Sequence, residues 1–395
     1  MTTVAYICAD PGVPVYGSKG ASVHVQEMVR SFRNRGIEVR LYCTRVGDHR
    51  PEDLVDVPVV CVPVDGVDDR GLPPRLRVAA RERRQATAAT TLAQTAIRDG
   101  AGLVYERYSL FSTALDQVCG ELGIPGVLEV NAPLIDEQRE HRQLVDEGAA
   151  DRALADQCAR AEVVTTVSPP VADWVQKRIG ADLGHRVRVV PNGVNTRRIR
   201  TVRAGFSERP EVVFVGTLKP WHGVEVLIEA ARLAKSPWRL RLIGDGPEGP
   251  RLREQAQRLG LAVEFRGAVA PMDIPDALDG ALLAVAPYPA ETSPGEQYFS
   301  PLKVYEYSAA GLPVVASRIG QLPSIVRHGE TGLLVPASDP AALASAIDTL
   351  VADPTLAHRM GAAGRALMVA EHSWDAVLDR ALTGVGTPNA RMAFR

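Results

Sequence analysis

The segment from Tyr298 to Ser317 combines a helix start with residues that could bind an anion. Ser300 and Pro301 predict an N-cap followed by a first-turn proline, and a helix is expected over residues 302–310. Gly-Leu-Pro then ends this helix before the apolar strand 314–317. The pattern therefore predicts a loop, a helix and a strand in close succession.

The start of this helix is suited to a phosphate group. The backbone N–H groups of Leu302 and Lys303 lack partners within the helix, and both these donors and the helix dipole favour an anion. A lysine in a first helical turn is electrostatically unfavourable unless an anion is bound. One turn further, the Glu306 carboxylate could accept hydrogen bonds from paired hydroxyls such as those of a ribose. On this segment alone, an ordinary helix with a solvated lysine and glutamate fits equally well.

A second candidate site is the loop 10–21, which follows the apolar strand 3–9 and precedes a helix over 22–35. The strand 36–43 comes next, and such a β-loop-α-β unit predicts a parallel sheet with right-handed crossovers. Ligands of open parallel sheets lie beyond the carboxyl ends of the strands, where this loop is expected. Gly17 and Gly20 would let the backbone approach a ligand, although glycines also serve turns without any ligand. The loop lacks a G-x-G-x-x-G fingerprint, which disfavours a nicotinamide dinucleotide.

The rhythm of strands and helices runs through both halves of the chain and predicts an α/β fold. In the first half, further apolar runs lie at 57–63, 101–105, 126–130, 163–167 and 187–191; in the second half they lie at 211–215, 239–243, 262–265, 282–286, 314–316 and 332–335. We expect two Rossmann-like, doubly wound domains facing each other across a cleft. The predicted divisions are an N-terminal domain 1–198, a basic linker 199–209, a C-terminal domain 210–372 and a C-terminal helix in 373–395 that packs back on the N-terminal domain.

Composition excludes several classes of protein. The 395 residues carry a formal net charge of −2, which gives no reason to expect nucleic acid. The five cysteines lie singly, as in reduced intracellular thiols, and no Cys or His spacing predicts a bound metal. No apolar run is long enough to span a membrane, and the N-terminus lacks the pattern of a signal peptide. The sequence therefore predicts a cytoplasmic protein without a built-in metal or cofactor, and it says nothing of the oligomeric state.

The segment from Arg70 to Arg84 is strongly basic, with six arginines against the single acid Glu82. A basic amphipathic helix can rest weakly on an anionic membrane surface or hold an acidic acceptor. A solvated helix face is the more frequent case, and the small apolar residues between the arginines favour it.

Several motifs, in this order along the chain, resemble one known family. They are Val15-Tyr-Gly-Ser-Lys-Gly-Ala-Ser-Val-His24, Val190-Pro-Asn-Gly-Val194, Gly216-Thr-Leu-Lys-Pro-Trp-His-Gly223, Leu242-Ile-Gly-Asp-Gly-Pro247, Phe265-Arg-Gly-Ala-Val269 and Ser300-Pro-Leu-Lys-Val-Tyr-Glu306. Together they look like the retaining GT-B glycosyltransferases of the glycosyltransferase family 4 group. The resemblance implies a nucleotide sugar bound mainly by the C-terminal domain and a hydroxyl acceptor bound mainly by the N-terminal domain.

The resemblance also implies roles for individual residues. Glu306 takes the place of the family's ribose-binding glutamate, the segment from Arg266 through Gly267 to Val269 matches the base side, and Gly20 would approach the diphosphate. The full set of expected substrate-binding residues is Gly17, Gly20, Gly216, Thr217, His222, Gly244, Gly246, Arg266, Gly267, Val269, Ser300, Pro301, Leu302 and Glu306.

The sequence departs from the family pattern at its charged positions. Thr217 and His222 stand where the family usually has two basic residues, so we expect Lys219 and Lys303 to supply the positive charge that a leaving diphosphate needs. Tyr298 stands where the family has an acid, and Glu291 or Glu296 could replace that acid. Asn131 falls near the position of a histidine that often lies beside the reacting sugar.

The expected reaction is transfer of a hexosyl unit to a hydroxyl with retention at the anomeric carbon, with UDP favoured over GDP as the carrier. No Asp-x-Asp motif follows a predicted strand, and Asp65, Asp68 and Asp69 fit a solvated turn, so the reaction is expected to be metal-independent. Two alternatives stay open at this point. One is a nucleotide-sugar epimerase on the same fold, and the other is a non-catalytic protein that binds nucleotide sugars.

Overall fold

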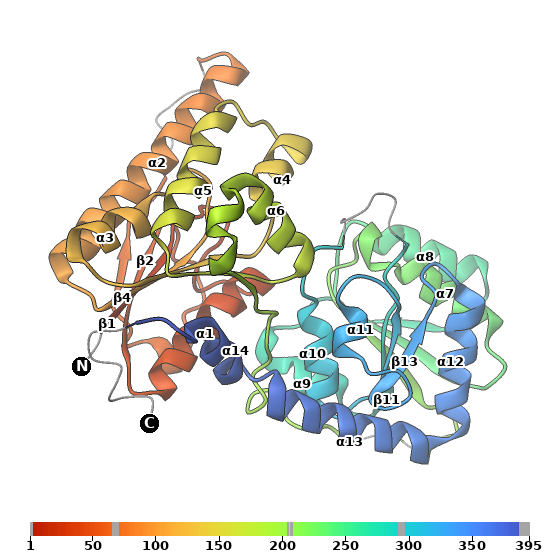
Figure 1. Ribbon diagram of the computed structural model, residues 1–395. Coiled ribbons are helices and arrows are strands. Elements are labelled where there is room, and N and C mark those ends of the chain that lie inside the picture. Colours follow the sequence, from red (N-terminus) through yellow and green to blue (C-terminus); the bar gives the residue numbers. More distant parts are fainter. Residues whose placement is uncertain (1–2, 65–70, 204, 206–207, 291–296, 387–395) are drawn as a thin grey trace. The chain divides into compact units, whose positions relative to one another are not determined.

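The computed structural model describes residues 3–64, 71–203, 205, 208–290 and 297–386 (Figure 1). Several residues named above lie outside these ranges: Asp65, Asp68, Asp69, Arg70, Glu291 and Glu296. The chain folds into two compact units, each with its own sheet. We call Met1–Pro191 with Val377–Arg395 the N-terminal unit and Asn192–Ala376 the C-terminal unit.

The described part of the N-terminal unit contains a seven-stranded sheet in the order β3-β2-β1-β4-β5-β6-β7, and every neighbouring pair is parallel. The strands are β1 Thr3–Cys8, β2 Glu38–Cys43, β3 Val59–Cys61, β4 Leu103–Arg107, β5 Gly126–Val130, β6 Val163–Thr166 and β7 Val187–Val189. This is the strand order of a doubly wound fold, and its direction reverses between β1 and β4. The central strands are buried along nearly their whole length, which explains their continuous apolar sequence.

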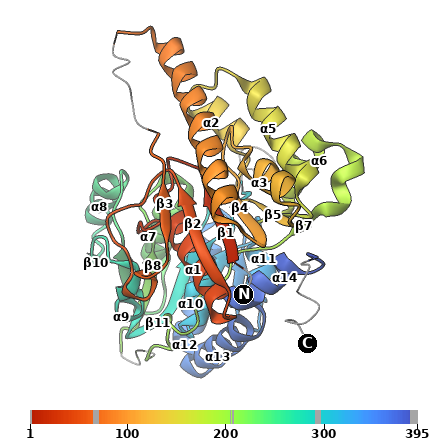
Figure 2. The ribbon, with the colours of Figure 1, turned by 90° about the vertical axis from the view of Figure 1, so that its left-hand side faces the viewer.

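Helices cover both faces of this sheet, with α2, α3 and α5 on one face and α1 on the other (Figure 2). The helices of this unit are α1 Gly20–Asn34, α2 Pro74–Asp99, α3 Ala114–Leu122, α4 Leu134–His141, α5 Glu147–Arg160 and α6 Pro169–Ile179. The last helix, α14 Trp374–Leu382, lies beside α1, and Asp379 pairs with Arg35 at the end of α1 at 2.6 Å (Figure 1). The prediction that the C-terminal helix packs back on the N-terminal half is therefore confirmed.

The described part of the C-terminal unit has a six-stranded parallel sheet in the order β10-β9-β8-β11-β12-β13. Its strands are β8 Glu211–Val215, β9 Arg239–Ile243, β10 Val263–Phe265, β11 Ala281–Ala286, β12 Val314–Ser317 and β13 Gly332–Val335. Its helices are α7 Val224–Leu233, α8 Gly249–Arg258, α9 Ile274–Leu278, α10 Leu302–Ala309, α11 Leu322–Ile325, α12 Pro340–Ala352 and α13 Pro354–Glu371. The α/β class and two Rossmann-like sheets predicted from the sequence are confirmed.

Two apolar clusters lie on opposite faces of the second sheet. Alternate residues of β8 show the division, since Val212 and Phe214 pack with α7, α8 and α12, whereas Val213 and Val215 pack with α9 and α10. Ile199 and Val202 are buried and belong to the cluster that contains Val213 and Val215. The segment expected as a linker over 199–209 therefore contributes core residues, and the compact units divide earlier in the chain, between Pro191 and Asn192.

One local expectation at α10 is wrong. The helix begins at Leu302, Pro301 holds the N-cap position, and no side chain caps the helix. The Ser300 hydroxyl instead accepts a hydrogen bond from the Asn192 backbone N–H at 3.1 Å and lies 3.2 Å from the Tyr305 hydroxyl. A serine hydroxyl engaged by another loop is not available to cap its own helix.

No helix within the described residues is both long and apolar enough to cross a lipid bilayer.

Candidate functional site

In the C-terminal unit the strand order reverses between β8 and β11, the position where doubly wound sheets bind ligands. The loop after β8 runs from Gly216 through a 3-10 turn at Pro220–His222 to Gly223, where α7 follows. Tyr288 follows β11, and α10 begins nearby in sequence at Leu302. Most predicted donor-binding residues lie on these loops or on the first turns of α10.

Close backbone packing at the strand ends requires glycine at two of the predicted positions. Gly244 has φ of 136°, and a Cβ on it would lie 2.0 Å from the Gly216 carbonyl oxygen. Gly216 has φ of 152°, and a Cβ there would lie 2.6 Å from the Lys303 Nζ. Both are values of φ that side-chain-bearing residues rarely adopt. The glycines therefore bring the β8 and β9 loops together and leave room for the Lys303 ammonium beside Gly216.

Lys303 is the central charged group of this arrangement. Its Nζ is buried, lies 4.3 Å from the Phe214 ring centre and 5.4 Å from that of Tyr288, and has no hydrogen-bond partner among the described residues. Burial lowers the pKa of Lys303 to about 7, despite the charge of Glu306, which acts in the opposite direction. A buried ammonium without a bonded acceptor is costly, and an anion bound next to it would restore its charge.

His222 does not replace the basic residue that the family usually has at its position. Its Nδ1 lies within hydrogen-bonding distance of the Thr217 carbonyl, and a carbonyl can only accept, so this nitrogen carries the proton. Burial lowers the pKa of His222 to about 3, with a smaller effect from the charge of Lys303. The imidazole is therefore neutral near pH 7 and presents Nε2 as an acceptor. Lys303 is thus the buried cation at this strand end within the described residues.

Glu306 is held by an arginine that is distant in the sequence. Arg198 Nη2 lies 3.0 Å from Glu306 Oε1, and Arg198 Nη1 donates to the Pro271 carbonyl at 2.6 Å. Only 9% of the Arg198 side chain and 19% of the Glu306 side chain are exposed. This pair holds the Glu306 carboxylate in place on α10.

The start of α10 is anchored to the beginning of the C-terminal unit. The Asn192 side-chain amide donates to the Ser300 carbonyl at 3.1 Å, in addition to the contact of its backbone N–H with the Ser300 hydroxyl. Ser300 and Pro301 are buried, whereas Leu302 is partly exposed. Tyr298, at the position of the missing acid, is partly buried.

The remaining predicted donor-side residues are less enclosed. The Gly244 N–H donates to the Gly267 carbonyl at 2.7 Å, which joins the ends of β9 and β10, and Gly246 lies against the Leu218 backbone. Arg266 is exposed and pairs with Glu264 at 2.8 Å, and Val269 packs against the core.

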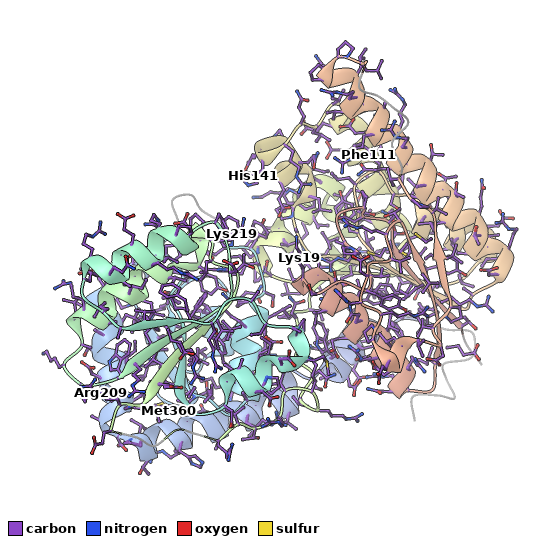
Figure 3. All side chains as sticks on the ribbon, turned by 180° about the vertical axis from the view of Figure 1, so that it is seen from behind. Lys19, Phe111, His141, Arg209, Lys219 and Met360 are labelled. Carbon is purple, nitrogen blue, oxygen red and sulfur yellow. The ribbon has the colours of Figure 1, made fainter. Side chains whose placement is uncertain are left out.

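Two predicted residues lie on the outer part of the β8 loop. Lys219 lies on the loop after β8 (Figure 3) and is partly exposed. Its Nζ lies 5.4 Å from the Trp221 ring centre. Thr217 is exposed apart from the contact of its carbonyl with His222.

In the N-terminal unit, Asn131 follows β5 and belongs to a buried polar cluster. His24 Nε2 lies 2.5 Å from Glu129 Oε1, and both side chains are almost fully buried. Burial raises the pKa of Glu129, but His24, together with Arg107 and Asn131, outweighs it and holds the pKa below its usual value. Asn131 therefore helps to keep a buried carboxylate charged.

The first loop ends earlier than its sequence suggested. Gly20 is the first residue of α1, whereas the helix was expected to begin at 22. A Cβ on Gly17 would lie 2.7 Å from the Ser22 hydroxyl oxygen and 2.8 Å from Pro14 Cγ, so tight packing of the loop itself accounts for this glycine.

Two ion-pair partners were not expected from the sequence. Arg198 was placed at the edge of a linker, although it binds Glu306, and the buried pair of His24 and Glu129 was not foreseen. A signal was present for the second pair, since a histidine in the first turn of a helix and an acid near a strand end both lie at the carboxyl edge of a parallel sheet.

Among the described residues, no group of three or more His, Cys, Asp or Glu side chains could hold a metal ion.

Family models match both halves of the chain. Residues 18–198 match the model described as Glycosyltransferase Family 4, and residues 209–353 match the model described as Glycosyl transferases group 1. The first match covers most of the N-terminal unit and extends past its boundary at Pro191, whereas the second lies wholly within the C-terminal unit. Both matches agree with the family resemblance predicted from the motifs.

Curated relatives support the same assignment. A GDP-mannose-dependent alpha-(1-6)-phosphatidylinositol monomannoside mannosyltransferase of Mycobacterium tuberculosis is 33% identical over 232 residues, which are 54% of this chain and 59% of that protein. The chain thus spans less than two thirds of that relative's length. An alpha-maltose-1-phosphate synthase of Mycolicibacterium smegmatis is 29% identical over 403 residues, covering 93% of this chain and 95% of that protein.

Solved structures share the fold. The Anabaena protein HepE in complex with UDP and glucose superposes with a TM-score of 0.68 at 18% identity, covering 96% of this chain and 98% of that one. Sucrose-phosphate synthase from Thermosynechococcus elongatus gives a TM-score of 0.69 at 22% identity, covering 98% of this chain and 100% of that one. The GT-B fold predicted from the sequence is confirmed.

Proposed function

The chain belongs to the family 4, or group 1, glycosyltransferases, and from this membership we propose that it moves a hexosyl unit from a nucleoside-diphosphate sugar to an acceptor hydroxyl with retention of configuration. The observation that carries this proposal is the buried Lys303 ammonium at the carboxyl end of β8, with no hydrogen-bond partner among the described residues. A diphosphate would supply the anionic acceptor that this ammonium lacks.

Lys303 acts on the leaving group in this proposal. As the bond between the anomeric carbon and the diphosphate oxygen breaks, negative charge grows on that oxygen, while the sugar becomes similar to an oxocarbenium ion. An ammonium held in a largely apolar pocket stabilises this developing charge more strongly than it would in water. The neutral His222 cannot do so, and Lys219 provides a second, more exposed cation.

Glu306 binds the ribose of the donor. Arg198 orients the Glu306 carboxylate, and a carboxylate accepts strong hydrogen bonds from paired hydroxyls. The loops carrying Gly244, Gly246 and the segment 266–269 would receive the rest of the nucleotide, as the family resemblance implies.

The transfer step proceeds by direct attack of the acceptor and needs no protein nucleophile. The acceptor oxygen forms a bond to the anomeric carbon on the face from which the diphosphate departs, and the acceptor proton passes to the released diphosphate. Asn131 contacts the reacting sugar in this proposal, as the family resemblance implies.

UDP is the proposed carrier on the basis of the family resemblance, and GDP is the alternative. A relative is named as GDP-mannose-dependent, whereas a structure that shares the fold was solved with UDP. Titration of the protein with UDP and with GDP by calorimetry decides between them, and tight binding of GDP with weak binding of UDP would overturn the choice.

Donor turnover tests the function itself. A panel of UDP-sugars and GDP-sugars is incubated with the protein, and release of the nucleoside diphosphate is followed with and without added acceptors. We expect slow hydrolysis of one donor and faster release when a suitable acceptor is present. A protein that binds nucleotide sugars but never releases the nucleotide would instead be a binding protein.

A further inference from the structure

The N-terminal unit contains a pocket of about 370 Å³ that the sequence analysis did not foresee. It is lined by the segment 10–12 after β1, the segment 109–111 after β4, and residues of α2, of α4 and of the chain just after α4. It therefore lies where the strand order of this unit reverses, at the carboxyl edge of the sheet. Its volume falls within the range of about 300–1,000 Å³ that is usual for small-molecule sites.

Three acidic side chains line the pocket, those of Asp10, Glu82 and Glu137, and the first two are bonded to the backbone. Glu82 on α2 is buried and accepts hydrogen bonds from the Val145 and Asp146 N–H groups at 2.7 and 3.0 Å. Asp10 accepts from the Gly12 N–H at 2.7 Å. The Glu82 carboxylate thus holds the chain just after α4, beside Arg142, and its negative charge is compensated by these donors.

The basic side chains around the pocket, in contrast, make no hydrogen bonds or ion pairs with other described residues. Arg81 on α2, His141 at the end of α4 and the adjacent Arg142 all line the pocket, and none of their side chains bonds to another described residue. Three unused cationic or protonatable groups around one cavity are suited to a phosphate group. Uncharged polar side chains, including those of Gln85 and Gln143, line the same pocket and suit hydroxyls.

The segment 109–111, which lines the pocket, has a strained backbone at one residue. Phe111, which lines the pocket, has φ of 64° although it is an aromatic residue, and its side chain is buried (Figure 3). Such a conformation costs on the order of 1–3 kcal/mol and occurs mainly where the surrounding structure holds a ligand-binding segment in place.

We infer that this pocket binds the acceptor, and that the acceptor is a polyhydroxylated molecule that carries a phosphate group. Arg81, Arg142 and His141 bind the phosphate, and the amide side chains bind hydroxyls. This inference rests on the proposed function, because a transferase needs an acceptor site in addition to its donor site. The phosphate belongs either to a free sugar or polyol phosphate or to a lipid headgroup. If the phosphate belongs to a lipid headgroup, the exposed Leu72, just before α2, and Leu76, in its first turn, would contact the lipid.

Binding measurements on the full chain test the inference without requiring turnover. The soluble probes are glucose 1-phosphate and myo-inositol 1-phosphate, each compared with its unphosphorylated counterpart by calorimetry. The pocket variant is the double substitution Arg81→Gln with Arg142→Gln. The control is Arg77→Gln with Arg83→Gln, which removes the same charge from exposed positions of α2 that do not line the pocket.

We expect at least one phosphorylated probe to bind tenfold or more tightly than its neutral counterpart. The pocket variant should lose this binding at least tenfold, while the control variant stays within twofold of the wild type. Equal binding of phosphorylated and neutral probes, or equal losses in the two variants, would overturn the inference.

A parallel arm uses phosphatidylcholine vesicles with and without phosphatidylinositol. Binding that needs phosphatidylinositol and fails only in the pocket variant identifies a lipid headgroup as the source of the phosphate. Equal losses in the two double variants, with no soluble probe bound, would mean general attraction to an anionic surface and would refute the pocket assignment. UDP and GDP are titrated in the same samples, so a failure of the proposed donor site is seen separately from a failure of this pocket.

Discussion

Replacement of Lys303 by methionine should change how the stability of the protein depends on pH. The ordinary pKa of a lysine is 10.5, and burial lowers that of Lys303 to about 7. Between these two values the unfolded chain binds more protons than the native state, so the free energy of unfolding rises with pH across this window. Methionine has a similar length and carries no proton, so the variant lacks this contribution.

The magnitude follows from the two pKa values. At about 1.36 kcal/mol per pKa unit, Lys303 makes the native state roughly 4 kcal/mol less stable at pH 7 than at a pH above 10.5, and about 2 kcal/mol of this is recovered between pH 7 and pH 9. Wild type should therefore gain about 2 kcal/mol relative to Lys303→Met over that interval. A saturating nucleoside diphosphate should reduce the difference, because the bound anion raises the pKa of the lysine again.

Urea denaturation at pH 7, 8 and 9, followed by tryptophan fluorescence, measures these free energies. Lys235→Met is the matched control, because that lysine is exposed in the same unit and lies outside the candidate site. Parallel pH profiles for wild type and Lys303→Met would refute the argument, since the lysine would then titrate alike in the native and unfolded states.

Four further predictions concern other parts of the protein. Glu306→Gln should weaken nucleoside diphosphate binding by about 2 kcal/mol, roughly thirtyfold, because a charged acceptor for the ribose is lost; calorimetry measures it, and unchanged affinity would contradict the ribose role. Gly244→Ala should destabilise the protein by about 3 kcal/mol or more, because the new Cβ would lie 2.0 Å from a carbonyl oxygen. The control Gly260→Ala, with nothing within 4 Å of its Cβ, should cost only about 1 kcal/mol. Equal shifts in melting temperature for the two variants would argue against close packing at Gly244. The pKa of Glu129 lies below the ordinary glutamate value of 4.5, so this carboxylate stabilises the native state above pH 4.5, and the stabilisation is lost as the pH falls through the native pKa. Glu129→Gln should therefore make the free energy of unfolding depend less on pH in the acid range. An unchanged pH dependence there would exclude Glu129 as its source. Turnover should survive strong chelation, and a loss restored only by Mg²⁺ or Mn²⁺ would show that the reaction needs a metal.

The sequence predicted the elements well because their signals are local. Val314–Ser317 and Gly332–Val335 are continuous apolar runs between turn residues, and both form buried strands at the expected places. The helix from Leu302 was also found, but its cap was not, because the Ser300 hydroxyl bonds to a residue more than a hundred positions away. A capping pattern in sequence cannot show that its side chain is already engaged.

The candidate site depended on contacts between distant residues and was predicted only in part. The pattern indicated Lys303 as a phosphate ligand, but not that Phe214 and Tyr288 enclose it and lower its pKa. Likewise, Glu306 was identified, while its partner Arg198 was assigned to the end of the N-terminal domain, next to the predicted linker. Burial and ion pairing arise from tertiary packing, so residue types and spacing alone do not determine them.

The most direct test of the central claim is the anomeric configuration of the first sugar released from a nucleotide-sugar donor. With an α-linked UDP- or GDP-hexose as substrate and water as the acceptor, proton NMR at early times separates the α from the β anomer before they interconvert. We expect release of the nucleoside diphosphate together with the α anomer, and strongly reduced release by Lys303→Met. Initial formation of the β anomer, or full turnover by Lys303→Met, would contradict it.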